Sequence, residues 1–240
     1  MAQIVVFMPC IIYIETSTNV CSVAISQNSQ LLFEKSSLEG PSHAALLGVF
    51  IEEALAVLEK RKQRPDAIAV SSGPGSYTGL RIGVSMAKGL CFGYGIPLIA
   101  VPTLDIVASK AIRKIENTGE SLYCAMLDAR RMEVYAALYD RDMNQVRETQ
   151  ADIVTAETYE SFLKDRKVYF VGNGASKCKE IILSPNAIFP DQIDPLASDM
   201  IFLAEKRYEV GDFQDAAYFE PFYLKEFVAT IAKNKVLGNS

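Results

Sequence analysis

The sequence predicts an α/β protein made of two lobes, in which one βββαβα unit occurs twice. Two triplets of short strand-like runs support this fold class: Cys10–Ile14, Val20–Ser26 and Leu31–Ser36, and later Tyr123–Asp128, Met132–Tyr139 and Gln145–Val154. Helical and strand-like segments alternate after each triplet, which is typical of a mixed sheet flanked by helices. Hydrophobic residues make up 50% of the 240 residues, which is enough to fill a sizeable core in each lobe.

The segments after each triplet complete the two units. The first unit continues with a helix, a strand, a helix and a strand at His43–Lys60, Ala67–Ser72, Thr78–Tyr94 and Pro97–Val101. After a connecting helix, the second unit continues with a helix, a strand and a helix at Ala156–Lys164, Val168–Val171 and Ala175–Leu183. A last helix is expected to return to the first lobe. The predicted domains are residues 8–103 with the returning helix at 196–209, residues 104–195, and a C-terminal tail at 210–240.

The charge balance argues against a protein that works mainly by binding nucleic acid. The chain has 24 Lys and Arg against 29 Asp and Glu, a net charge of −5, and no basic stripe is visible in it. Proteins that hold phosphate backbones draw most of that affinity from basic surfaces. Any contact with nucleic acid is therefore expected to be made through a partner.

Cysteine usage and the N-terminal segment predict a cytoplasmic protein. The five cysteines are odd in number and have no CxxC spacing, which favours free and mostly buried thiols in a reducing compartment. The apolar run from Met1 to Ile14 lacks a basic n-region, and Glu15 ends it too early to span a membrane. A first β-strand is the better interpretation, with a second candidate start at Met8.

A glycine-rich segment, from Ser71 to Gly83, joins a strand to a helix. Gly73, Gly75, Ser76 and Thr78 form a candidate nucleotide or anion loop, because backbone N–H groups at a helix N-terminus attract anions. The spacing matches neither a Walker A loop nor the dinucleotide fingerprint, and the lysine that would reach a phosphate is absent. A tight structural turn is the alternative.

The two helices of the first unit have more small or apolar surface than one sheet needs. Two rows of small residues recur every four positions in the second helix: Gly79, Gly83 and Ala87, and Ser85, Gly89 and Gly93. Each interior glycine costs a helix about 1 kcal/mol relative to alanine, so a close neighbour is expected on each row. The first helix is apolar over about half of its circumference, whereas a helix on one sheet needs a stripe of about 100°. The surplus predicts either a broad core contact or a partner surface.

Catalytic machinery is not expected in this chain. His43 is the only histidine, so neither a metal-binding histidine pair nor a Ser-His-Asp triad with a GxSxG elbow is present. Glu15 and Asp128 each end the first strand of a unit and could face one cleft, where paired carboxylates do acid–base or metal–phosphate chemistry. The turn after Glu15 lacks glycine, however, and the turn from Asp128 to Arg131 could be closed by an internal ion pair. We predict no catalytic and no metal-binding residues.

Several segments together resemble the TsaB family, also called YeaZ. They occur in the family's order over nearly the whole chain: Ile14–Thr18, Cys21–Ala24, Gly73–Gly83, Leu127–Arg130, Glu133–Tyr135 and Glu220–Leu224. The resemblance implies an actin-like (ASKHA, ribonuclease H-like) fold. It also implies a non-catalytic role as partner of the transferase TsaD, with the ATPase TsaE, in forming threonylcarbamoyladenosine next to the tRNA anticodon. ATP and a metal are then expected on the partners, and no cofactor on this chain alone. The family usually has Asp at the position of Glu15, which argues further against nucleotide binding here.

The resemblance also implies where the partner binds. The usual family contact is a bundle of the first two helices of each partner, and these are the two helices with surplus surface. The residues expected to bind the partner are His43, Leu46, Leu47, Phe50, Ile51, Ala54, Gly79, Arg81, Ile82, Gly83, Met86, Ala87 and Leu90. The same helices could pair two copies of the chain when it is alone. An actin-fold phosphotransferase or a glycoprotease-like enzyme is the alternative function.

Overall fold

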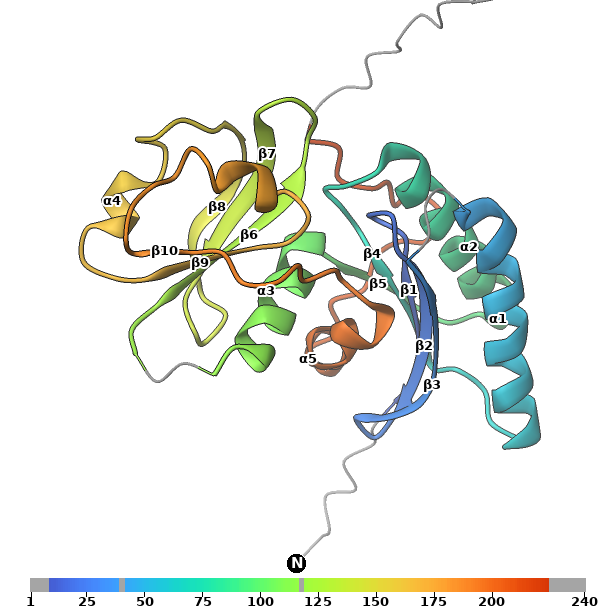
Figure 1. Cartoon of the computed structure of the whole chain (residues 1–240). Coiled ribbons are helices and arrows are strands. Elements are labelled where there is room, and N and C mark those ends of the chain that lie inside the picture. Colours follow the sequence, from blue (N-terminus) through green and yellow to red (C-terminus); the bar gives the residue numbers. More distant parts are fainter. Residues whose placement is uncertain (1–8, 39–41, 117–118, 225–240) are drawn as a thin grey trace, which may run out of the picture.

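The computed structural model describes residues 9–38, 42–116 and 119–224 and contains two five-stranded sheets with helices packed on them (Figure 1). The first sheet has the order β3-β2-β1-β4-β5, formed by β1 (Cys10–Glu15), β2 (Cys21–Gln27), β3 (Gln30–Ser37), β4 (Ala67–Ser71) and β5 (Leu98–Val101). The second has the order β8-β7-β6-β9-β10, formed by β6 (Leu122–Asp128), β7 (Glu133–Tyr139), β8 (Gln145–Ile153), β9 (Val168–Val171) and β10 (Ala187–Ile188). In both sheets the first three strands pair antiparallel and the last two join in parallel. The prediction of two duplicated mixed sheets flanked by helices is confirmed.

Helices cover both faces of the first sheet. On one face, α1 (His43–Lys60) and α2 (Tyr77–Tyr94) lie side by side and share a core cluster with β1 (Figure 1). The opposite face packs against the 3₁₀ turn η2 (Ala197–Met200) and α5 (Ile201–Glu209). Between the lobes lies α3 (Thr103–Lys114), which contributes to a core cluster on each side. Its Asp105 accepts hydrogen bonds from Tyr139 of β7 at 2.8 Å and from Arg207 of α5 at 3.1 Å.

Two helices expected in the second lobe are much shorter than predicted. The segment at 156–164 contains only α4 (Glu160–Leu163), and the segment at 175–183 contains only the 3₁₀ turn η1 (Ser176–Cys178). Before α4, the Thr158 hydroxyl accepts a hydrogen bond from the Thr155 N–H at 2.8 Å, and such local bonds compete with helix formation. After η1, Pro185 disfavours helical backbone at the residue before it, and the chain forms β10 instead.

Of the apolar N-terminal run, the described residues from Cys10 onward form β1, the central strand of the first sheet. All six residues of β1 are buried, as expected for a strand covered on both faces. All five cysteines are free and buried, as predicted, and burial raises the pKa of Cys10, Cys21 and Cys91 to about 11. Among the described residues, no helix is both long and apolar enough to cross a membrane. The candidate start at Met8 lies outside the described residues.

Candidate functional site

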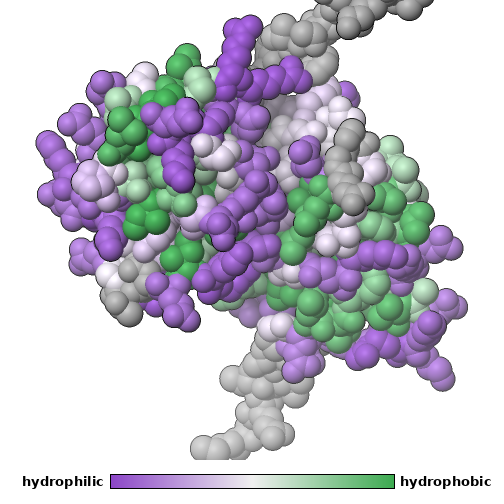
Figure 2. Space-filling view, viewed as in Figure 1, coloured by the Kyte–Doolittle hydropathy of each residue, from purple (hydrophilic) through white to green (hydrophobic). Residues whose placement is uncertain are grey.

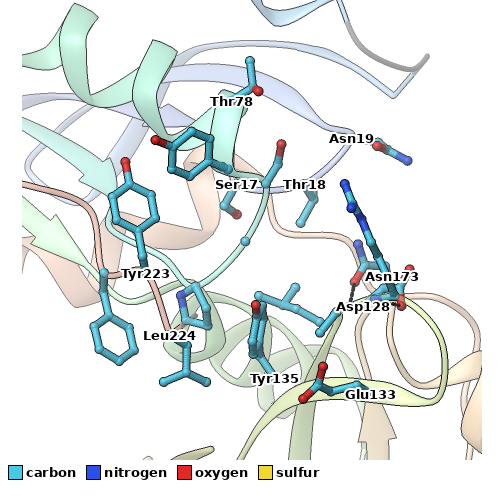
Figure 3. Close-up of a pocket in the computed structure, with 18 of the residues that line it drawn as sticks. Ser17, Thr18, Asn19, Thr78, Asp128, Glu133, Tyr135, Asn173, Tyr223 and Leu224 are labelled. Carbon is cyan, nitrogen blue, oxygen red and sulfur yellow. Dashed lines mark hydrogen bonds between the residues drawn. The ribbon is translucent and has the colours of Figure 1, made fainter. Parts of the chain in front are cut away.

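A cleft of about 670 Å³ opens between the two lobes. The β1–β2 turn and the loop before α2 line it from the first lobe, and the β6–β7 turn lines it from the second. The last described segment of the chain, Phe222 to Leu224, completes the wall. Figure 3 shows Tyr223 and Leu224 on one side of the cleft, and Asn19, Asp128 and Asn173 on the other.

The glycines of the candidate anion loop are accounted for by contacts within the chain. Gly73 has a φ of 102°, and a Cβ atom there would lie 2.6 Å from the carbonyl oxygen of Phe222. A Cβ atom at Gly75 would overlap the carbonyl oxygen of Ser17, which also accepts a hydrogen bond from the Ser76 N–H at 2.6 Å. Carbonyl oxygens, not free space for a phosphate, therefore occupy the places that these glycines leave open. Anion binding by this loop stays a prediction, and Ser76 and Thr78 are the two of its four residues that are exposed.

The two candidate carboxylates do not meet in the cleft. Glu15 is fully buried and does not line the cleft, whereas Asp128 is exposed on its wall. Asp128 forms an ion pair with Lys177, which lies outside the turn from Asp128 to Arg131, so the ion pair expected within that turn is corrected to one with a distant lysine. The same Lys177 ammonium donates to the carbonyl oxygens of Arg131 at 2.8 Å and Glu133 at 2.5 Å. This arrangement holds the β6–β7 turn in shape, and Asp128 does not form the expected carboxylate pair with the buried Glu15.

Glu15 carries the most perturbed carboxyl group of the site. Its Oε1 accepts hydrogen bonds from the Ser17 N–H at 2.6 Å and the Ser17 hydroxyl at 2.5 Å, while its Oε2 has no hydrogen-bond partner among the residues that the structure describes. Burial raises the pKa of Glu15 to about 7, although the hydrogen bonds from Ser17 oppose that shift. Glu15 is therefore a structural group beneath the cleft whose charge is costly to the fold.

We expect Glu15→Gln to flatten the fall in stability between pH 5 and pH 8. Because the folded-state pKa of about 7 lies above the ordinary value of 4.5, the folded chain retains a proton that the unfolded chain has released. The wild-type chain therefore loses stability as the pH rises from 4.5, the pKa of the unfolded state, to about 7, the pKa of the folded state. The neutral amide of the Glu15→Gln variant does not titrate, so the variant does not show this loss. The difference between variant and wild type should reach roughly 2–3 kcal/mol at pH 8, measured by denaturant unfolding. The exposed Glu180→Gln is the matched control, and parallel pH profiles for Glu15→Gln and wild type would contradict this account.

His43 is a packed polar group at the start of α1. It is 7% exposed, and its Nε2 lies 2.9 Å from the carbonyl oxygen of Thr18 and 3.1 Å from that of Val20. The imidazole joins α1 to the β1–β2 turn through these contacts.

Most of the residues expected to bind a partner are buried within the chain itself, and their role in binding stays a prediction. The buried ones are His43, Leu47, Phe50, Ile51, Ala54, Gly79, Gly83 and Ala87. The reason on α2 is the β1–β2 turn, because a Cβ at Gly79 would overlap the Thr16 carbonyl oxygen and one at Gly83 the Thr16 hydroxyl. That hydroxyl donates to the Gly79 carbonyl oxygen at 2.8 Å. Leu46, Ile82, Met86 and Leu90 are only partly buried, and Arg81 is exposed.

The second row of small residues on α2 faces outward. Ser85, Gly89 and Gly93 are exposed, and no other part of the described chain lies within 4 Å of a Cβ placed at either glycine. Phe92, which the sequence analysis did not select, is 91% exposed.

The neighbouring helix α1 shows the same pattern. Gly48 is equally open, and beside it Val49 is 47% exposed; neither was selected from the sequence. The exposed residues Gly48, Val49, Ser85, Gly89 and Phe92 are named here the bare-helix surface. Figure 2 shows hydrophobic atoms at the right of the view, on the side of the first lobe that carries these two helices. On α2 the four-residue spacing of Ser85, Gly89 and Gly93 in the sequence indicated this exposed row. Val49 and Phe92 belong to no such repeat, so nothing in the sequence indicated that they would be exposed.

These features define a two-lobed protein of actin-like fold that exposes small and apolar residues on a pair of helices. Residues 38–233 match the family model TsaD, described as tRNA N6-adenosine threonylcarbamoyltransferase. The tRNA threonylcarbamoyladenosine biosynthesis protein TsaB of Escherichia coli K12 is 31% identical over 225 residues, which cover 91% of this chain and 96% of that protein. The TsaB of Bacillus subtilis 168 is 28% identical over 205 residues, which cover 82% of this chain and 87% of that protein. The chain therefore belongs to the TsaB (YeaZ) family.

Solved structures agree with this assignment. YeaZ from Pseudomonas aeruginosa superposes with a TM-score of 0.75 at 26% identity, covering 90% of this chain and all of that one. A second structure, described as an uncharacterized protein with similarity to peptidase YEAZ from Pseudomonas aeruginosa, gives a TM-score of 0.78 at 26% identity, covering 91% of this chain and 100% of the other. The expectation of an actin-like fold is confirmed.

Proposed function

We propose that this chain is a non-catalytic subunit that binds a TsaD-like transferase and, with a TsaE-like ATPase, supports the formation of threonylcarbamoyladenosine next to the tRNA anticodon. The names of its TsaB relatives support a role in this biosynthesis. The observation that carries the proposal of docking is the bare-helix surface, where Gly48 and Gly89 remain uncovered by the described chain. Interior helix glycines lower stability, so glycines without a neighbour in their own chain indicate a neighbour in another.

The bare-helix surface has the chemistry that a helical partner needs. Small residues let two helix axes approach closely, as Gly48 and Gly89 would allow on α1 and α2. Phe92, almost fully exposed, supplies a large aromatic side chain of the kind that anchors interfaces. The partly buried Leu46 and Met86 extend the apolar area beside it. We therefore propose that the transferase contacts this exposed surface, and not the eight buried residues named above.

The cleft supports a role without catalysis. Of the two strand-end carboxylates expected to face it, Asp128 is held by Lys177, and Glu15 is buried beneath the wall. ATP and a metal are accordingly proposed to bind the partners and not this chain alone. With a net charge of −5, the chain is proposed to meet tRNA only within the complex, in the cytoplasm. The bare-helix surface could also pair two copies of the chain when no transferase is present.

A reconstituted reaction tests the proposal directly. Transferase, ATPase, tRNA and the pathway substrates are expected to yield modified adenosine only when this chain is added, and the transferase is expected to co-elute with it. Calorimetry of the isolated chain with ATP and Mg²⁺ is expected to show no binding. Turnover of ATP or cleavage of a protein substrate by the isolated chain would contradict the proposal in favour of a phosphotransferase or a glycoprotease-like enzyme.

A further inference from the structure

After α5 the chain returns along the first lobe as an extended strap, defined here as residues 214–224 (red in Figure 1). It begins at the edge strand β5, where the Gln214 N–H donates to the Leu98 carbonyl oxygen at 2.8 Å. Ala216 and Phe219 then pack against the core cluster beneath α1 and α2. At its far end the Phe222 N–H donates to the Ser72 carbonyl oxygen at 2.7 Å, just past the end of β4. The strap is thus attached to the first lobe at both ends.

The strap contacts α2 at two points about three turns apart. The Lys88 ammonium donates to the carbonyl oxygens of Ala217 and Phe219, both at 3.1 Å. At the N-terminus of α2, the ring centroid of Tyr223 lies 5.0 Å from that of Tyr77, the first residue of the helix. The Arg81 guanidinium donates to the Tyr77 hydroxyl at 2.7 Å, so Tyr77 joins the strap to the first turn of α2.

The same end of the strap forms part of the cleft wall. The Phe222 carbonyl oxygen lies 2.6 Å from where a Cβ atom of Gly73 would be, so the strap and the loop before α2 are in close contact there. Figure 3 shows Tyr223 and Leu224 facing the cleft from the side opposite Asp128. Direct contacts therefore join the cleft wall to the first turn of α2: Phe222 to Gly73, and Tyr223 to Tyr77.

We propose that the strap is a positioning element, in which Phe222 contacts the loop at Gly73 and Tyr223 packs on Tyr77. Together they hold this loop and the first turn of α2 in the arrangement that binds the transferase. The inference rests on the proposed function, because it takes α2 as a docking helix. Tyr223 acts through Tyr77 and is not part of the bare-helix surface. Docking and strap attachment are then linked, so each strengthens the other by the same factor.

Three variants test the strap: Tyr223→Ala, Tyr223→Phe, and Tyr218→Ala as a matched control, since Tyr218 lies in the same strap and is 83% exposed. Tyr223→Ala is expected to raise amide hydrogen exchange at residues 72–80 and to weaken transferase binding roughly fivefold, the scale of one aromatic pair. Exchange in the second lobe is expected to stay unchanged, which separates a local release from global destabilisation. Tyr223→Phe keeps the ring contact and should restore both values, and Tyr218→Ala should alter neither.

Unchanged exchange at 72–80 in Tyr223→Ala would overturn the strap's hold on the loop. Raised exchange with unchanged affinity would overturn its link to docking. If Tyr223→Ala does not fold, the test is made on the wild-type chain, by measuring hydrogen exchange of the Phe222 amide with and without bound transferase. Bound transferase is expected to slow this exchange, and an unchanged rate would overturn the proposal. Failure of the wild-type chain to bind any transferase would instead reject the proposed function, while the exchange data on the isolated chain would still report on the strap.

Discussion

Gly89→Arg is expected to weaken transferase binding by a factor of about 100 or more while making the isolated chain more stable. Gly89 is exposed in the middle of α2, and no other part of the described chain lies within 4 Å of its missing Cβ. Arginine is a better helix former than glycine, so the free energy of unfolding should rise by about 0.5–1 kcal/mol. At a close helix–helix contact, the same side chain would force the axes apart and bury a charge without a partner. Calorimetry for the dissociation constant and thermal unfolding for stability measure the two effects.

The opposite signs of these effects make the result specific. Loss of binding in a destabilised protein could come from disturbed folding, but loss in a stabilised protein can come only from the surface itself. Ala156→Arg is the matched control, because Ala156 is exposed in the second lobe between β8 and α4. If Gly89→Arg bound the transferase as tightly as this control, the outward row of α2 would be excluded from the interface.

Gly79→Ala and Gly89→Ala, in the same helix, are expected to change stability in opposite directions. A Cβ at Gly79 would overlap the backbone carbonyl oxygen of Thr16, which cannot move without displacing the end of β1. We expect a loss of roughly 3 kcal/mol, the upper range for overpacking, and a fall in Tm of about 6–12 °C for a chain of this size. Gly89→Ala meets open space and should gain up to about 1 kcal/mol. Thermal and denaturant unfolding of both variants measure the pair.

Equal effects of these two alanines would mean that the β1–β2 turn does not pack on α2 as described. The comparison also bears on the design of docking experiments. A large side chain at Gly83 would overlap the Thr16 hydroxyl inside the chain, so lost binding in a Gly83→Leu variant would report disturbed folding. On α2, only substitutions in the outward row of Ser85, Gly89 and Gly93 can change docking without disturbing the fold of the chain.

The duplicated architecture could be predicted because its signals are local. Alternating strands and helical periodicity are properties of neighbouring residues, and they identified every strand of the first sheet to within a few residues. The second lobe was less predictable. Thr155 and Thr158 satisfy each other's hydrogen-bonding groups, and Pro185 favours extended backbone before it, so two apolar segments that could be helical form short turns instead.

By itself the sequence determined that α2 has two rows of small residues, that α1 is broadly apolar, and that one histidine cannot form a metal-binding pair. Which row faces the core was decided only by the tertiary structure, because the deciding contact joins Thr16 to Gly79, far apart along the chain. The position of the strap could likewise not be predicted from the periodicity of the sequence. Its hydrogen bond from Phe222 to Ser72 joins residues on either side of the second lobe in the sequence, and it forms only because the chain returns to the first lobe. Spacing along one helix records which faces are small, but only the packing of distant segments determines which of those faces remains exposed.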